Sequence, residues 1–143
     1  MDDRPRFTFR KAERLCSKKR IEGLFASGRS LSAFPVRVVY QPLAPEAETD
    51  GSVPDVQVLV SVSKRHFKHA VDRNRLKRLI REAYRLNKHL LLTPLQGRRL
   101  SVAFIWMSGE KADFHTVEAR MKNLLQRIVE NERIRNEGAA GAV

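Results

Sequence analysis

The side chains best suited to chemistry in this sequence form a dense group of cations about halfway along the chain. Arginine outnumbers lysine among them, and a guanidinium group can bind two phosphate oxygens at once, which an ammonium group cannot. If the stretch is helical, each residue advances about 100° and the cations share one broad arc of the helix surface. The members of this arc are Arg73, Arg75, Lys77, Arg78, Arg81, Arg85 and Lys88. We therefore predict a basic helix face that binds a polyanion.

The opposite arc of the same helix is apolar, which predicts that it packs on a sheet. Its members are Leu76, Leu79, Ile80, Ala83, Leu86 and Leu90. Glu82 is the one acidic residue within the cationic arc, and its spacing allows an ion pair with Arg78 or Arg85. A merely solvated helix face usually mixes both signs, because like charges at helical spacing repel. Solubility alone is therefore a poor explanation of this face.

The charge of the whole chain points the same way. Lys and Arg number 28 against 16 Asp and Glu, a formal net charge of +12. Residues 64–88 carry +8 of it, and residues 1–29 carry +5, while residues 30–63 are acidic. Nucleic acid and an anionic membrane surface are the two polyanions that such a charge suits. The apolar arc lacks the Trp and Phe typical of membrane-surface helices, so nucleic acid is favoured.

The remaining reactive side chains do not form a convincing catalytic or metal site. Ser61 and Lys64 have Ser-x-x-Lys spacing, but Ser61 lies in an alternating, strand-like stretch and the partner motifs of that chemistry are missing. His66 and His69 are too few for zinc, which takes three or four ligands. Cys16, the single cysteine, has no base beside it in sequence and cannot form an internal disulfide. We expect no catalytic side chain and no metal site of the protein's own.

The elements that must position these residues follow from periodicity. A short helix is predicted over 18–27, with Ser17 as its N-cap and Gly28 at its end. Alternation predicts strands over 36–40, between Pro35 and Pro42, and over 56–62, which should pair antiparallel. The stretch 100–107 is apolar on both faces, as a central strand would be. A 3.6-residue period predicts a long final helix over 113–136.

With the basic helix, the order is helix, strand, strand, helix, strand, helix. The fold class is α+β: a two-layer sandwich with a central, mostly antiparallel sheet and helices on one face. Residues 1–137 should form a single RNA-binding domain, with 43–54 as an exposed acidic insertion and 138–143 as a disordered tail. No apolar run approaches the roughly 20 residues of a membrane span, and the N-terminus lacks a secretory signal. We expect a cytoplasmic protein.

Two sequence patterns resemble a known family. The run Ser61-Val62-Ser63-Lys64-Arg65, followed by residues 70–82 with Arg73-Asn74-Arg75, closely resembles the signature of the protein subunit of bacterial ribonuclease P. That family carries an Arg-Asn-Arg helix directly after a strand that ends in Ser/Ala-Lys-Lys. The N-terminal residues that fit the same family are Phe9, Arg14-Leu15, Phe25 and Gly28. The resemblance extends to about residue 135.

The resemblance implies a function. The family's holoenzyme removes the 5′ leader from precursor tRNA, and its catalytic centre is RNA, with Mg²⁺ bound mainly by the RNA subunit and the substrate. The protein supplies no catalytic side chain and has catalytic RNA and precursor tRNA as partners. By position, the catalytic RNA would be bound by Arg73, Asn74, Arg75, Lys77, Arg78 and Arg81. The resemblance also implies a left-handed crossover around the Arg-Asn-Arg helix.

The resemblance further implies a cleft between the first helix and the sheet, which holds the single-stranded leader. By position it would be formed by Ile21, Phe25, Val39 or Tyr40, and Lys64 with Arg65. Unpaired bases stack on aromatic rings while neighbouring cations follow the backbone, which suits Phe25 and Tyr40. Either ring could equally be plain core. Ile21 departs from the aromatic residue that the family often has there.

Two alternatives to a ribonuclease P subunit stay open from the residues alone. The chain could be a general basic RNA-binding or ribosome-associated module without a role in cleavage. A helix-turn-helix DNA-binding protein is disfavoured, because that motif needs a helix and a short turn before the recognition helix. Here the stretch before Ala70 is strand-like.

Overall fold

The four strands form one sheet whose order differs from their order in the chain. The computed structural model describes residues 11–43, 56–95 and 98–141, with 135–141 described by their backbone. The strands are β1 (Arg29–Ala33), β2 (Val36–Leu43), β3 (Val56–Val62) and β4 (Arg99–Trp106). They lie in the order β1-β2-β4-β3. The last strand therefore sits inside the sheet, as its apolar character on both faces predicts.

The pairing of the strands corrects one sequence prediction. β2 does not pair with β3: it pairs antiparallel with β1 and with β4, and β3 pairs parallel with β4. Strands joined by a short connection usually pair antiparallel, whereas a helical crossover leads to a parallel neighbour. Here the crossover between β3 and β4 runs through helix α2 (Ala70–Asn87) and the short helix α3 (His89–Leu92). The predicted α+β class with a mostly antiparallel sheet is confirmed.

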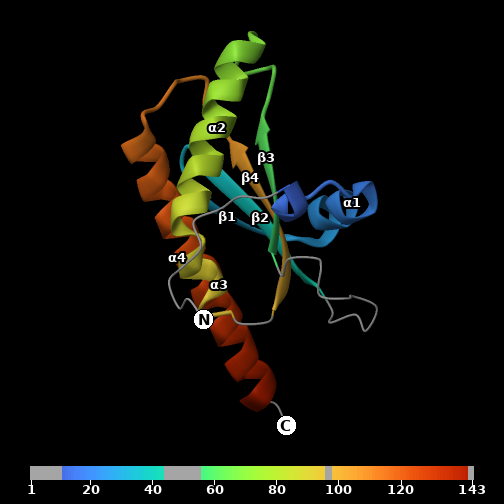
Figure 1. The fold of residues 1–143 in the computed structure, drawn as a ribbon. Helices are drawn as coiled ribbons and strands as arrows, with labels where there is room; N and C mark the ends of the chain where they lie inside the picture. The colour runs from blue at the N-terminus through green and yellow to red at the C-terminus, as the bar shows by residue number, and fades with distance from the viewer. Residues whose placement is uncertain (1–10, 44–55, 96–97, 142–143) are drawn as a thin grey trace.

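The helices cover both faces of the sheet, not one. Helices α2, α3 and α4 (Phe114–Gly141) pack together on one face, and α1 (Lys18–Ser27) lies on the other (Figure 1). The prediction of helices on one face is thus wrong for α1. Alternate side chains of β2 explain this, because Val38 and Tyr40 join the core under α2 and α4 while Val39 joins a smaller core under α1. Among the described residues, no helix is long and apolar enough to cross a membrane.

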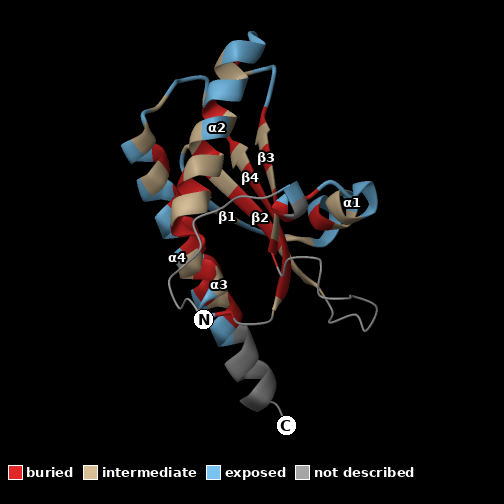
Figure 2. Ribbon diagram, in the orientation of Figure 1, coloured by how far each residue is buried: buried red, intermediate tan, exposed pale blue. Residues whose placement is uncertain are grey.

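The larger core fixes the orientation of α2. Val56, Val58, Val60 and Val62 of β3 are buried on the side that α2 covers, as their strict alternation predicts. Leu76, Ile80, Ala83 and Tyr84 are buried on the facing side of α2. Figure 2 shows the buried residues concentrated along these facing surfaces. The other side of α2 must then face solvent.

The ends of several elements differ from the sequence prediction. The five-residue strand β1 was not predicted, because it is mostly exposed and too short to alternate clearly. Pro42 lies inside β2 instead of ending it. The final helix continues to Gly141, through most of the stretch expected to be disordered. The predicted insertion 43–54 lies outside the described residues except for Leu43.

Candidate nucleic-acid interface

The residues of α2 that are predicted to bind RNA, five cations and one asparagine, are all at least partly exposed. Asn74, Arg75 and Arg78 are exposed, and Arg73, Lys77 and Arg81 are half-buried. We call these six residues the basic face. The buried arc of the same helix contacts the sheet and α4. Three of the six, Asn74, Arg78 and Arg81, line one pocket together.

Arg73 also makes structural contacts within the protein. One of its guanidinium nitrogens, Nη1, donates hydrogen bonds to the carbonyl oxygens of Phe67 (2.8 Å) and Lys68 (3.0 Å). These carbonyls belong to the turn that joins β3 to α2, before the helix begins at Ala70. Arg73 thus holds the turn against the first turn of the helix. Arg75 has no such contact among the described residues and is exposed.

Two further cations of the predicted arc, Lys88 and Arg85, form ion pairs within the protein. Lys88 is buried, because the long helix ends at Asn87 and Lys88 lies between α2 and α3, where it contacts the N-terminal segment. Its Nζ atom forms an ion pair with Glu13 at 2.9 Å. Arg85 is paired with Glu82, and its Nε donates to Oε2 at 3.0 Å. Of the two partners that the spacing allows for Glu82, the structure thus has Arg85.

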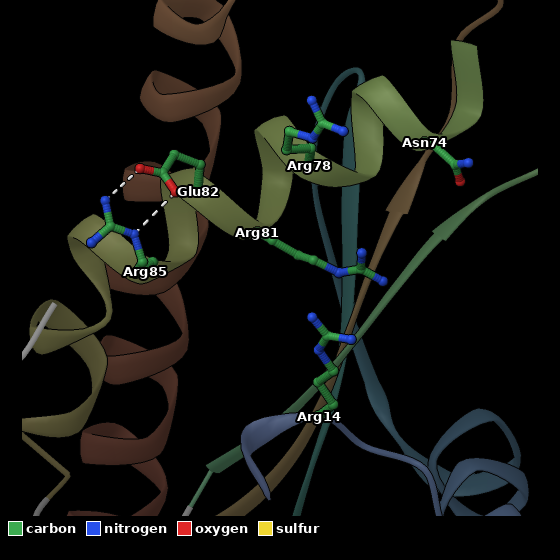
Figure 3. A pocket seen from close by; sticks show the side chains of 6 residues that line it. All are labelled: Arg14, Asn74, Arg78, Arg81, Glu82 and Arg85. Carbon is green, nitrogen blue, oxygen red and sulfur yellow. Dashed lines mark hydrogen bonds and ion pairs between the residues drawn. The ribbon is translucent and has the colours of Figure 1, made fainter. Parts of the chain in front are cut away.

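A pocket on this surface is shared between α2 and the N-terminal segment. The described residues that line it are Arg14, Asn74, Arg78, Arg81, Glu82 and Arg85 (Figure 3). Arg14 follows the short 3₁₀ helix η1 (Lys11–Glu13) and pairs with Val58 in an isolated parallel bridge at the edge of β3. Figure 3 shows the guanidinium groups of Arg14 and Arg81 pointing toward each other. The resemblance marked Arg14-Leu15 as typical of the family, but nothing in the sequence placed Arg14 beside the basic helix.

The electrostatics of this pocket favour an anion. Partial burial and then the nearby charge of Arg14 lower the pKa of Arg81, yet a guanidinium stays protonated at physiological pH. Of the described lining residues, Glu82 alone is acidic, and the hydrogen bond from Arg85 lowers its pKa. Glu82 is therefore ionised and forms an ion pair with Arg85.

The residues predicted for a leader cleft separate into two groups. Ile21, half-buried, packs on a small core under α1 that includes Val39, which is buried. Phe25 is 50% exposed at the end of α1, so it is not plain core. Tyr40 is on the opposite face of the sheet, fully buried, and its hydroxyl accepts a hydrogen bond from Asn131 of α4 at 3.3 Å. Tyr40 is therefore excluded from a cleft beneath α1, because neighbouring strand residues point to opposite faces.

Lys64 and Arg65 lie in the turn after β3, and both are exposed. On the face of the sheet that carries α1, Leu59 and Ile105 are half-buried apolar side chains that pack against the same small core as Ile21. α1 thus covers only part of this face. Leu59 and Ile105 each keep part of their apolar surface accessible on this face.

The described residues do not fit a divalent metal ion. They contain no group of three or more His, Cys, Asp or Glu side chains able to hold one. Mg²⁺ prefers carboxylate and carbonyl oxygens, whereas the basic face presents cations and one amide. The residues set aside on sequence grounds lie elsewhere: His66 and His69 lie in the segment before α2, and Ser61 lies in β3.

Comparisons with known proteins agree with this picture. The Ribonuclease P family model matches residues 9–129. The ribonuclease P protein component of Porphyromonas gingivalis strain W83 is 44% identical over 133 residues, which are 92% of this chain and 93% of that protein. That of Chlorobium phaeobacteroides is 36% identical and covers 85% of this chain and 88% of its own length.

Solved structures share the fold. The RNase P protein from Thermotoga maritima superposes with a TM-score of 0.62 at 25% identity, over 80% of this chain and 96% of that one. A Staphylococcus aureus RNase P protein gives 0.63 at 19% identity, over 82% and 96% of the two chains. The family model and the relatives span the sheet, the basic face and most of α4. The chain therefore belongs to the ribonuclease P protein family.

Proposed function

We propose that this chain is the RNA-binding protein subunit of a ribonucleoprotein that removes the 5′ leader from precursor tRNA. The observation that carries the proposal is the basic face, which follows a strand and a Lys64-Arg65 turn in a chain of this family. α2 is held by a large core on its other side, so its cations are presented on a rigid support. Rigid presentation reduces the entropy lost on binding.

The protein's part is binding, and the RNA partner performs the cleavage. Cations of the basic face neutralise phosphates of the catalytic RNA and release condensed counterions. Bidentate contacts from arginine to phosphate fix the position of the RNA on the protein more tightly than lysine contacts would. Mg²⁺ supplies the charge stabilisation of phosphodiester hydrolysis, and we assign its ligands to the RNA and the substrate. No side chain of this chain takes or gives a proton at the scissile phosphate in this scheme.

The leader of precursor tRNA occupies the face of the sheet beside α1. Phe25 offers an exposed ring for stacking, and Ile21, Leu59 and Ile105 offer partly exposed apolar surface. Lys64 and Arg65 offer exposed cations for the leader's phosphates. This surface and the basic face lie on either side of β3, an edge strand of the sheet. One small domain can therefore contact catalytic RNA and leader together.

A reconstituted cleavage assay tests the proposal. The full chain is mixed with the catalytic RNA of the same organism, and cleavage is measured on precursor tRNA with a long leader and with a one-nucleotide leader. We expect cleavage at lower Mg²⁺ than with the RNA alone, and tighter binding of the long-leader substrate only. Leader-specific cleavage by RNA-free protein would contradict the proposal.

The same assay separates the alternative of a general RNA-binding module. Such a module would bind many RNAs without preferring the leader-bearing substrate. Equal affinity for the two substrates in the presence of the protein, with no change in the Mg²⁺ requirement, would therefore favour the alternative. A matched control is an unrelated basic protein of similar net charge, which should not distinguish the substrates.

A further inference from the structure

We propose that Arg37 selects guanine at one position of the precursor tRNA leader, by donating two parallel hydrogen bonds to the edge of the base. Arg37 lies on β2, on the face of the sheet that carries α1, and Ser30 of β1 holds its side chain in place. This inference rests on the proposed function and adds a preference for one base to the leader surface beside α1. The ligand recognised is the edge of a base and not a phosphate.

Arg37 lies on the same face of the sheet as the residues assigned to the leader. Alternate residues of a strand point to the same face, so Arg37 shares its face with Val39, which belongs to the small core under α1. Directly opposite Arg37 on β4 is Ile105, one of the half-buried apolar residues of this face. Opposite Ile105 on β3 is Ser61, next to the last residue of that strand. Arg37 therefore belongs to a row of side chains near the turn after β3.

A hydrogen bond fixes the orientation of the Arg37 guanidinium. Its Nε atom donates to Oγ of Ser30 at 2.7 Å. Ser30 is two positions from Ser32, the residue of β1 that pairs with Arg37, so the bond runs diagonally between neighbouring strands. Within the described residues, Nη1 and Nη2 of Arg37 make no hydrogen bond or ion pair. One bond thus holds the guanidinium while its two outer nitrogens stay available to a ligand.

The surroundings of Arg37 suit a base better than a phosphate. Ile105 beside it and Leu59 on β3 offer partly exposed apolar surface, on which unpaired bases can lie. Bases that lie on the sheet turn their edges toward side chains of the same strands. The leader's phosphates are assigned in the proposed function to the exposed cations Lys64 and Arg65. A guanidinium held on the strands therefore meets the edge of a base.

Guanine is the base that best fits two parallel donors on this surface. Its O6 and N7 atoms are adjacent acceptors, and arginine contacts this pair more often than any other in sequence-specific recognition. Adenine and uracil present no two adjacent acceptors on a base edge. Cytosine does, but a purine has the larger ring surface for stacking on the apolar side chains of this face, such as Ile105. Guanine thus combines both contacts.

Cleavage of precursor tRNAs that differ at one leader position at a time tests the proposal. The full chain is assembled with the catalytic RNA of the same organism, and kcat/KM is compared for the four bases at each position. We expect guanine to be favoured over adenine and uracil at one position by about 5- to 150-fold, the range for one bidentate contact. Arg37→Gln should remove this preference. Replacing the guanine by 7-deazaguanine, which lacks the N7 acceptor, should lower kcat/KM for the wild-type chain and not for Arg37→Gln.

Three further variants separate base recognition from other roles of an arginine. Arg37→Lys keeps the charge but not the paired donors, so it should also lose the guanine preference. Ser30→Ala removes the positioning hydrogen bond, so it should reduce the guanine preference and leave cleavage of the other leaders unchanged. Arg127→Gln is the matched control: Arg127 donates to the carbonyl oxygen of Ser32 at 2.6 Å, but from α4 on the other face, and its loss should leave the preference intact. Thermal unfolding of each variant checks that it is folded.

The outcomes distinguish failure of this inference from failure of the proposed function. A loss of kcat/KM in Arg37→Gln that is equal for all four bases would indicate a phosphate or structural contact and would overturn the inference. A wild-type complex that prefers long leaders without preferring guanine at any position would overturn it too, and the proposed function would stand. A wild-type complex that does not distinguish a long leader from a one-nucleotide leader would instead overturn the proposed function.

Discussion

Lys88 and Glu13 form an ion pair across 75 positions of sequence, with 2.9 Å between Nζ and Oε2. Their side chains are only 8% and 11% exposed. The pair joins the described part of the N-terminal segment to the end of α2, so residues around Glu13 are anchored to the fold. Residues 1–10 lie outside the described residues.

The Lys88→Met variant should be strongly destabilised. Removing one member of a buried pair leaves the other charge without compensation, at a cost of about 3–5 kcal/mol in the free energy of unfolding. Urea denaturation followed by circular dichroism measures it. The control is Lys122→Met, which removes an exposed ion pair with Glu118 at 3.9 Å and should cost roughly 0–1 kcal/mol. Similar losses in the two variants would mean that the Lys88 pair contributes no more than a surface pair.

Arg75→Ala and Arg73→Ala should differ in what they lose. Arg75 is exposed, so its loss should reduce the salt slope of RNA binding by about 1 and leave stability within about 0.5 kcal/mol. Arg73→Ala should reduce the slope as well, but it also removes the hydrogen bonds to Phe67 and Lys68 and should cost about 1 kcal/mol of stability. Binding titrations and urea denaturation report the two effects separately. An unchanged slope in both variants would show that the basic face contacts no RNA.

Phe25→Ala should weaken leader binding without weakening the fold. The ring is half exposed, so the free energy of unfolding should change by only about 0.5–1 kcal/mol, while a lost base stack costs roughly 1–3 kcal/mol. Affinity for long-leader precursor tRNA, compared with the one-nucleotide leader, is the measurement. Leu24→Ala, one residue earlier and fully buried, should instead cost about 2–5 kcal/mol of stability. An equal loss of affinity for both substrates in Phe25→Ala would contradict a role in leader binding.

Gly28→Ala should be destabilising although its backbone is in an ordinary region of φ. A methyl group there would collide with the carbonyl oxygen of Leu24 and lie 2.8 Å from Cγ1 of Val39, which forces α1 away from β2. We expect a loss of about 1–3 kcal/mol. Gly23→Ala is the control, because its nearest neighbour would be Gln41 Oε1 at 3.7 Å, and alanine should stabilise the helix by about 0.5–1 kcal/mol. Thermal melts that rank the two variants in the opposite order would refute this account.

Asp113 should make the stability of α4 depend on acid pH. It accepts hydrogen bonds from Thr116, including the backbone N–H at 2.9 Å, and these lower the pKa of the carboxyl below its ordinary value. Because the folded-state pKa is lowered, the stabilisation is complete above the unfolded pKa of about 3.9 and is lost as pH falls through the folded value. Asp113→Asn keeps an acceptor but does not titrate. The Tm difference between wild type and variant should therefore shrink below pH 4, and a constant difference would contradict this role.

Periodicity predicted the parts of the fold that each element determines by itself. Helix α1 begins and ends where Ser17 and Gly28 indicate, and Ser17 Oγ accepts from the N–H of Arg20 at 3.4 Å. The alternating valines of β3 and the basic and apolar sides of α2 are also as predicted. These features follow from residues close in sequence. Local pattern is enough to specify them.

The missed features depend on contacts between distant segments. Tyr40 and Val39 were equal candidates, because alternation separates two faces without saying which one α1 covers. Lys88 was predicted on the basic face, because a helical period cannot indicate that Glu13 lies beside it. Arg14 was missed as a pocket residue for the same reason. The family resemblance identified the basic face and the sequence around Arg14, but it did not indicate that the two lie close together.

The central position of β4 has a consequence for synthesis on the ribosome. Among the described residues, β3 has only the single bridge to Arg14 before β4 is made, and β2 has only β1. Both strands then present unpaired edges and apolar side chains, which favour wrong pairing with other chains. The sheet closes only when residues 99–106 have emerged, more than two thirds of the way along the chain. A ribosome-bound chain that stops before β4 should therefore be sensitive to protease. Resistance of the sheet to protease should appear in one step, after β4 has been synthesised.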